Sequence, residues 1–202
     1  MKHKTQNSSV ILCGARKSAV TMALLISSIS TVYSGPFDLK MGMKIEEIDR
    51  NAKDIGNNTY KVKLSSSHKT FDTYTVSMCP SGELYMIRAV SGDITTNSDG
   101  TELRSTFSGF KNKYKKAYGS GEHINHLSTS SPWTEKEDWM VGLIEDDRTL
   151  RTTWDRASEA TLSDNVTEIS LEALPIGINN GYILLSYKFS NYENCKTEQG
   201  IQ

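Results

Sequence analysis

Apolar residues recur along the chain at spacings that predict two amphipathic helices. The longer stripe, with steps of three and four residues, predicts a helix over 103–118 with one buried face: Leu103, Phe107, Phe110, Tyr114 and Tyr118. The preceding run Asp99-Gly100-Thr101-Glu102 is typical of a capping box. A shorter stripe predicts an earlier helix over 45–55 that ends at Gly56: Ile45, Ile48, Ala52 and Ile55.

Six segments have the alternation or the apolar character of β-strands. They cover residues 60–64, 74–78, 84–90, 149–154, 166–174 and 182–189. The third is almost continuously apolar, which favours a central strand. Pro80-Ser81-Gly82 and Asn179-Asn180-Gly181 predict turns between neighbouring strands.

Residues 119–131 lack any apolar period and predict a polar loop, after which Pro132 predicts the first turn of a third helix. Its expected buried face is Trp139, Met140, Leu143 and Ile144. The resulting order, α-βββ-α-α-βββ, predicts an α+β fold with helices packed on one face of an antiparallel sheet. One interpretation is that the two halves are loosely similar, although no repeat is visible residue by residue.

The first 34 residues have the layout of a secretory signal peptide. An apolar stretch over 18–32 follows a basic start, and Val32-Tyr33-Ser34 resembles a cleavage site. The basic residues are Lys2, Lys4, Arg16 and Lys17. We therefore expect cleavage before Gly35, a single domain over 35–202, and a periplasmic or secreted protein. The alternative is an uncleaved segment that anchors the protein in the inner membrane, although the run is shorter than the roughly 20 apolar residues of a spanning helix. That segment would be the only membrane contact.

Charge argues against nucleic acid as a partner. The whole chain has 23 Lys and Arg against 24 Asp and Glu. Loss of residues 1–34 would leave 19 bases and 24 acids, a net charge of −5. A general nucleic-acid binder normally carries a basic excess.

Two cysteines, Cys79 and Cys195, remain after export. In an oxidising compartment they are a candidate disulfide, because an even number of cysteines permits complete pairing. The alternative is two separate thiols, one buried at the end of a strand and one in a polar tail.

The predicted loop holds the candidate partner-binding residues. His123 and His126 are three apart, a spacing that would suit a metal on a helix. The surrounding glycines and serines predict a loop, and no third ligand is in view, so we expect no metal. Trp133 at the end of this loop is either an interface anchor or a packing residue at the start of the next helix.

No sequence motif indicates a catalytic or cofactor site. The chain lacks G-x-S-x-G, a glycine-rich phosphate loop and C-x-x-C, so we expect no cofactor and favour a protein that is not an enzyme. The predicted helix over 103–118 carries four lysines: Lys111, Lys113, Lys115 and Lys116. They form either a solvated helix face or a surface that binds an acidic partner or anionic lipid.

The start of the mature chain resembles a family of uncharacterised bacterial proteins. The shared pattern is Gly35-Pro36-Phe37-x-Leu39-x-Met41-Gly42-Met43, and Asp38 departs from it, because the family has glycine there. The resemblance continues through Gly100-Thr101-Glu102-Leu103, Glu137-Asp138-Trp139-Met140 and Ile169-Ser170-Leu171-Glu172-Ala173. It implies a bacterial origin, and it indicates no particular activity because the family has none assigned. Residues 39–48 also resemble small envelope proteins of the SmpA/OmlA type and the β-lactamase-inhibitor-protein fold, which implies protein binding in the periplasm.

These observations favour an exported α+β protein that binds another protein in the bacterial envelope, as an inhibitor, an immunity factor or an assembly accessory. The alternative is a periplasmic hydrolase whose site has no recognisable motif. A third hypothesis is an anionic-lipid binder that uses the lysine-rich helix.

Overall fold

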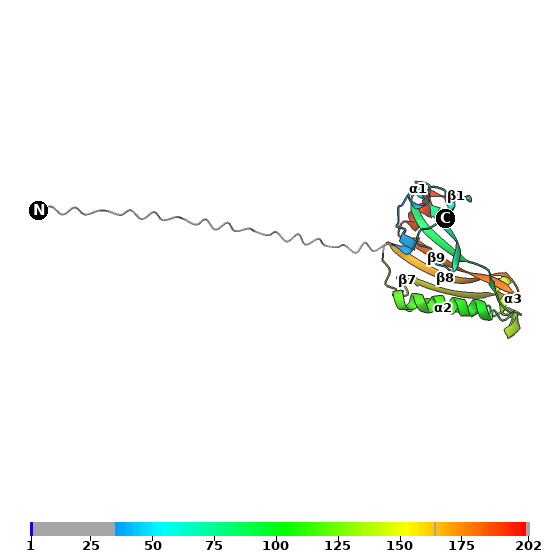
Figure 1. Cartoon of the computed structure of the whole chain (residues 1–202). Helices are drawn as coiled ribbons and strands as arrows, with labels where there is room; N and C mark the ends of the chain where they lie inside the picture. Colours follow the sequence, from blue (N-terminus) through cyan, green and yellow to red (C-terminus); the bar gives the residue numbers. More distant parts are fainter. Residues whose placement is uncertain (2–34, 164, 201–202) are drawn as a thin grey trace. The chain divides into compact units, whose positions relative to one another are not determined.

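The computed structural model describes Met1, residues 35–163 and residues 165–200. The predicted signal segment and its cleavage site therefore lie outside the described residues. Contacts group the described residues from Gly35 to Gly200 into one compact unit. Its described residues form an α+β structure with one antiparallel sheet of nine strands. Figure 1 shows the curved sheet with a long helix along one face.

The sheet consists of two meanders that meet in the middle. The first contains β1 (Lys53–Asp54), β2 (Thr59–Val62), β3 (Phe71–Met78) and β4 (Leu84–Ser91). The second contains β6 (Glu122–Leu127), β7 (Arg148–Asp155), β8 (Val166–Gly177) and β9 (Asn180–Phe189). The order β1-β2-β3-β4-β9-β8-β7-β6 makes β1 and β6 the edges, while the short β5 (Ile94–Thr95) pairs with β9.

Helix α2 (Thr101–Tyr118) packs across β8 and β9 on one face of the sheet (Figure 1). Its apolar stripe buries Leu103, Phe107 and Phe110, as the sequence predicts. The alternate strand residues beneath it are equally buried, including Leu171 and Leu185, which lie opposite each other on β8 and β9. Each large apolar side chain buried in this way contributes about 1.5–3 kcal/mol.

The start of α2 differs from the predicted capping box. Thr96 Oγ1 accepts a hydrogen bond from the backbone N–H of Glu102 and donates to the Glu102 carboxylate, at 3.1 and 2.8 Å. Asp99 instead forms an ion pair with Lys136 at 2.5 Å. Gly100 has a φ of 67°, and a Cβ there would lie 2.2 Å from the Trp139 ring, so both conformation and space require glycine.

The first helix is much shorter than predicted, because α1 covers only Ile45–Ile48. Asp49 ends it with extended backbone, and its carboxylate accepts hydrogen bonds from the backbone N–H groups of Asn51 and Lys63. Such local bonds compete with helical ones. Strand β1 follows, and Ile55 is 53% exposed rather than part of a buried face.

The third helix also starts later than Pro132 predicts. A 3₁₀ turn, η2 (Lys136–Asp138), leads into α3 (Trp139–Ile144). Three residues of its expected face are buried, Trp139, Met140 and Leu143, whereas Ile144 is 41% exposed. A similar turn, η1 (Pro36–Asp38), begins the described part of the domain.

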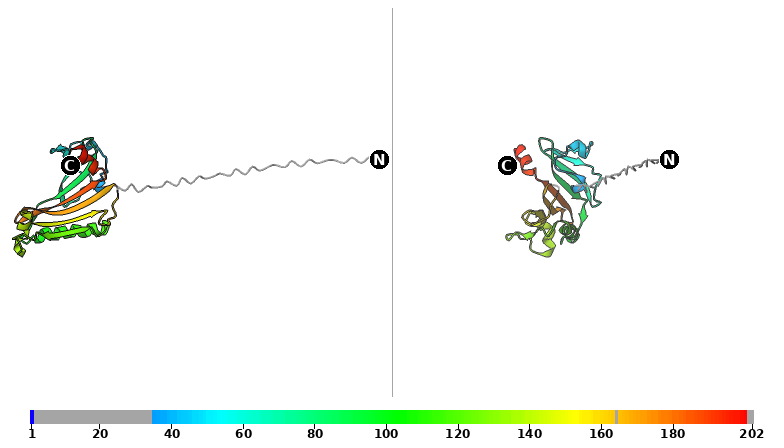
Figure 2. Two further views of the ribbon diagram at one scale, coloured as in Figure 1. Left: turned by 180° about the vertical axis from the view of Figure 1, so that it is seen from behind. Right: turned by 90° about the vertical axis from the view of Figure 1, so that its left-hand side faces the viewer.

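The predicted polar tail contains a helix, α4 (Tyr192–Glu198). It packs against Tyr85 and Met86, whose side chains form a small cluster separate from the main core. The right-hand view of Figure 2 shows α4, in red, on the side of the sheet away from α2. The prediction that all helices cover one face is therefore wrong for α4.

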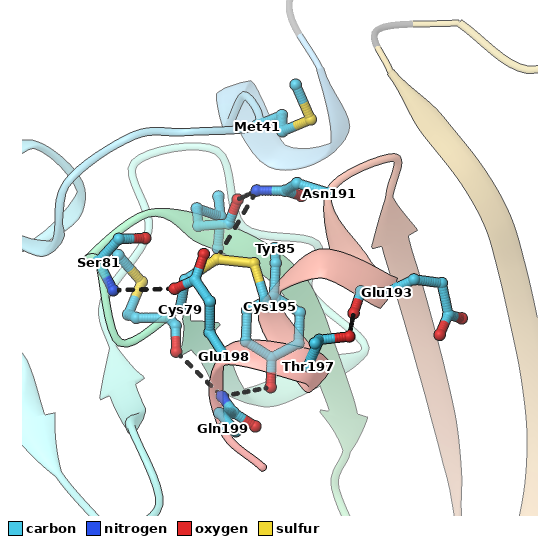
Figure 3. The surroundings of a disulfide bond; sticks show 12 residues. Met41, Cys79, Ser81, Tyr85, Asn191, Glu193, Cys195, Thr197, Glu198 and Gln199 are labelled. Carbon is cyan, nitrogen blue, oxygen red and sulfur yellow. Dashed lines mark hydrogen bonds between the residues drawn. A yellow bond between two sulfur atoms is a disulfide. The ribbon is translucent and has the colours of Figure 1, made fainter. Parts of the chain in front are cut away.

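A disulfide joins Cys79, just after β3, to Cys195 in α4 (Figure 3). The Cα atoms are 4.8 Å apart, within the range that a disulfide requires. Hydrogen bonds reinforce the attachment, since the Gln199 side chain donates to the Tyr85 hydroxyl and Ser81 N–H donates to the Glu198 carboxylate, both at 3.3 Å. A seven-residue polar helix is thus held by a covalent link and by its contacts with β4.

Within residues 35–163 and 165–200, no helix is both long and apolar enough to cross a membrane.

Candidate functional site

The predicted loop over 119–131 contains an edge strand, β6, that the sequence did not reveal. All six of its residues pair with β7 in uninterrupted register, from Glu122 opposite Thr153 to Leu127 opposite Arg148. In the part of the chain that the structure describes, no backbone hydrogen bond links β6 to an element other than β7. One side of β6 therefore offers backbone donors and acceptors to a further strand.

His123 is held between this strand and α2. Its Nε2 lies 3.4 Å from Lys111 Nζ, and its Nδ1 lies 2.9 Å from Thr152 Oγ1. Because a lysine ammonium can only donate, Nε2 is the acceptor and Nδ1–H donates to the threonine hydroxyl. The ring also lies 6.0 Å from Phe107.

The electrostatic surroundings of His123 favour the neutral ring. Desolvation by burial lowers its pKa from the ordinary value of 6.5, and the Lys111 charge lowers the pKa further. His123 is therefore a neutral support that connects the edge strand to α2.

His126 lies on the opposite face of β6, because residues three apart in a strand point to opposite sides. The structure thus does not bring the two histidines together as a pair of ligands. Among the described residues, no group of three His, Cys, Asp or Glu side chains could hold a metal ion.

Trp133 lies beyond β6 and is half-buried, between the two alternatives that the sequence left open. Its backbone N–H donates to Ser131 Oγ at 3.2 Å, and Ser131 Oγ donates to the Asp147 carboxylate at 2.9 Å. These bonds fix the backbone before α3 while part of the indole stays accessible. No hydrogen bond or ring contact in the described part of the chain joins Trp133 to His123 or His126.

The lysines of α2 are divided between its two flanks. Lys111 faces β6 through His123, whereas Lys113 is close enough to His68, on the other flank, to lower the pKa of that imidazole; burial of His68 is the larger cause. Lys115, one helical turn after Lys111, is exposed on the same side of the helix. Lys111 is therefore the α2 lysine that contacts β6, and Lys115 follows it on the same side of the helix.

The face of the sheet opposite α2 holds a polar hollow of about 440 Å³ that sequence reasoning missed. Its floor includes Ser186 and Ser170, which are paired on β9 and β8. Its walls include two ion pairs, Arg151–Glu172 at 3.6 Å and Lys188–Glu168 at 3.0 Å. The alternation of β8 could have indicated these outward polar positions, but only the register between strands brings them together.

No protein-family model, curated protein or solved structure matches the chain.

Proposed function

We propose that the protein is an exported protein-binding module of the bacterial envelope, and that its partner adds a strand to β6. The single observation that carries this proposal is the open outer edge of β6, which has six regularly paired residues. Strand addition uses backbone hydrogen bonds for affinity and alternate side chains for specificity. A six-residue strand provides enough length for several such bonds.

The surroundings of β6 support this mode of binding and indicate the chemistry of the partner. Lys111 contacts His123 of β6 and Lys115 follows one helical turn later on the same side of α2, so acidic side chains of an added strand would face this positive charge. Trp133 follows the edge strand and has the partial exposure of a contact residue.

The Cys79–Cys195 disulfide supports the proposed export. Disulfides persist in the periplasm and outside the cell, whereas the reducing cytosol keeps most thiols free. The predicted signal segment points to the same compartments.

Two neighbouring proline substitutions test strand addition directly. Ile124 and Asn125 are adjacent in β6, opposite Arg151 and Leu150. In an antiparallel pair, successive residues alternate between exchanging hydrogen bonds with the partner strand and pointing their N–H and C=O groups away. Ile124→Pro and Asn125→Pro therefore remove one N–H that bonds to β7 and one that faces the open edge.

Loss of the N–H that bonds to β7 should lower the melting temperature. Loss of the outward N–H should leave the melting temperature unchanged and abolish binding of the partner. A photo-crosslinking amino acid at His126 in the full chain, expressed in a bacterial host with an intact envelope, should capture a defined protein. The same amino acid at Lys53 in β1 is the matched control. Capture at both edges, or capture that survives the stable proline variant, would contradict the proposal.

A further inference from the structure

A cavity of about 350 Å³ lies away from β6, at the end of α2. Its walls come from the last turn of α2, the segment before β8, the strands β8 and β9, and the start of the domain: Ala117, Leu162, Ile169, Tyr187 and Pro36. The described residues that line it carry no charged side chain. Apolar and hydroxyl side chains make up this described lining, which suits an uncharged molecule better than a buried carboxylate or ammonium group.

The wall of this cavity contains one half of a buried pair of tyrosines. The hydroxyls of Tyr114 on α2 and Tyr187 on β9 are 2.6 Å apart. Tyr187 is only 4% exposed, and the ring of Phe37 packs edge-on against it at 5.8 Å. Burial raises the pKa of both phenols well above the usual range, so both keep their protons.

Among the described residues, this pair of hydroxyls has one hydrogen without an acceptor. Two hydroxyls supply two hydrogens, and the single bond between them uses one. Neither phenol has another hydrogen bond to a described residue. The nearby Tyr74 hydroxyl is engaged with the backbone N–H and C=O of His68, at 2.7 and 3.3 Å. Either hydroxyl can donate in this bond; when Tyr114 donates to Tyr187, the remaining hydrogen is that of Tyr187, the member of the pair that lines the cavity.

We infer that this cavity binds an uncharged organic molecule with an apolar body and one carbonyl-type acceptor, which the Tyr187 hydroxyl recognises. A buried donor that lacks a partner is costly, and an acceptor in the cavity removes that cost. Leu162 and Ile169 supply the contacts for the apolar body. This site is independent of the β6 edge.

Two fluorinated probes test the inference by ligand-observed ¹⁹F NMR on the full chain. 4-Fluoroacetophenone has the acceptor, and 1-ethyl-4-fluorobenzene has nearly the same shape without it. The ketone should bind about three- to tenfold more tightly, the ratio expected for one net hydrogen bond. Equal binding, or no binding of either probe, would overturn the inference.

Two matched variants assign the preference to one hydroxyl. Tyr187→Phe should reduce the ketone preference to about one, whereas Tyr114→Phe should keep it, because Tyr187 then has its hydrogen free for the ligand. Ala117→Phe places a ring at the exposed end of the cavity lining and should block binding of both probes. This variant keeps both tyrosines, so it tests the site even if a tyrosine variant fails to fold. A preference that survives Tyr187→Phe, or binding that survives Ala117→Phe, would show that the probes bind elsewhere.

Discussion

Strand β1 at one edge of the sheet has two residues, whereas β6 at the other edge has six. In β1 both residues are exposed, and Lys53 lies directly opposite Lys61 on β2, a repulsive cross-strand pair. In β6 the pairing with β7 is regular throughout. Proteins usually protect sheet edges with short strands, charges or bulges, and β1 has two of these features.

This difference indicates that the β1 edge is protected against pairing with a further strand, whereas the β6 edge is compatible with such pairing. The elements that pack on the two halves of the sheet also differ. In the half of the sheet that ends in β1, α4 and its disulfide cover part of β4. On the β6 side, α2 supports the strand from beneath through Phe107 and His123 but leaves its outer edge open.

The largest effect is expected from removing the support beneath β6. Phe107 is 1% exposed, and Phe107→Ala should lower the free energy of unfolding by about 3–5 kcal/mol, the cost of a large cavity. Lys113→Ala is the matched control and should change little, because its side chain is exposed. Denaturant unfolding measures both. Amide exchange should accelerate more in β6 than in β1, and the reverse order would contradict the comparison.

Removing the disulfide should weaken the other side of the sheet. The double variant Cys79→Ser and Cys195→Ser should cost about 2–5 kcal/mol, because the bridge closes a long loop of the unfolded chain. Amide exchange should rise in α4 and β4 while β6 keeps its protection. Loss of protection in β6 at the same rate would mean that the two edges are not independent.

A smaller effect is expected where the chain enters β6. Gly121 has a φ of 66°, and an added Cβ would lie 2.8 Å from Trp154 Nε1. Gly121→Ala should therefore destabilise the protein by about 1–3 kcal/mol through backbone strain and crowding. Gly109→Ala is the control, since a Cβ there meets nothing within 4 Å and alanine favours the helix. Equal melting temperatures for the two variants would show that the β6 entry is not constrained.

The smallest effect concerns pH. His123 has a pKa below 6.5 in the folded state, so the unfolded chain takes up a proton first as the pH falls. Its contribution to stability is present above pH 6.5 and declines as the pH falls toward the lowered folded-state pKa. His123→Gln should therefore flatten the acid side of the stability profile, measured by unfolding between about pH 7 and pH 5. His126→Gln, with no such contact to α2, is the control.

Much of the core could be predicted from the sequence because burial leaves a periodic pattern. Helix α2 and the strands β3, β4, β7, β8 and β9 all carry apolar residues at the spacing of their buried face. The order of strands could not be predicted, because the pairing of β4 with β9 depends on contacts almost 100 residues apart.

The candidate binding edge escaped prediction for the same physical reason. An edge strand buries little, so His123 and Asn125 leave no apolar alternation to recognise. Helix α4 is similar, since its position depends on Cys195 rather than on an apolar stripe. Nor could the sequence reveal the spare hydrogen of Tyr114 and Tyr187, because these residues are brought together only by the packing of α2 on β9.

The position of the disulfide also determines how the domain would respond to mechanical tension. Its two sulfur atoms enclose the chain from Cys79 to Cys195, which contains α2 and every strand from β4 to β9. If the chain is pulled from residues 35 and 200, the covalent bridge carries the load past this loop. Only the segment before Cys79 and the last residues can extend, and the 44 residues from 35 to 78 would span roughly 150 Å at full extension. Strand β6 would keep its structure under a force that peels β1, β2 and β3 away, whereas the cavity at Tyr187 would lose the wall that Pro36 supplies.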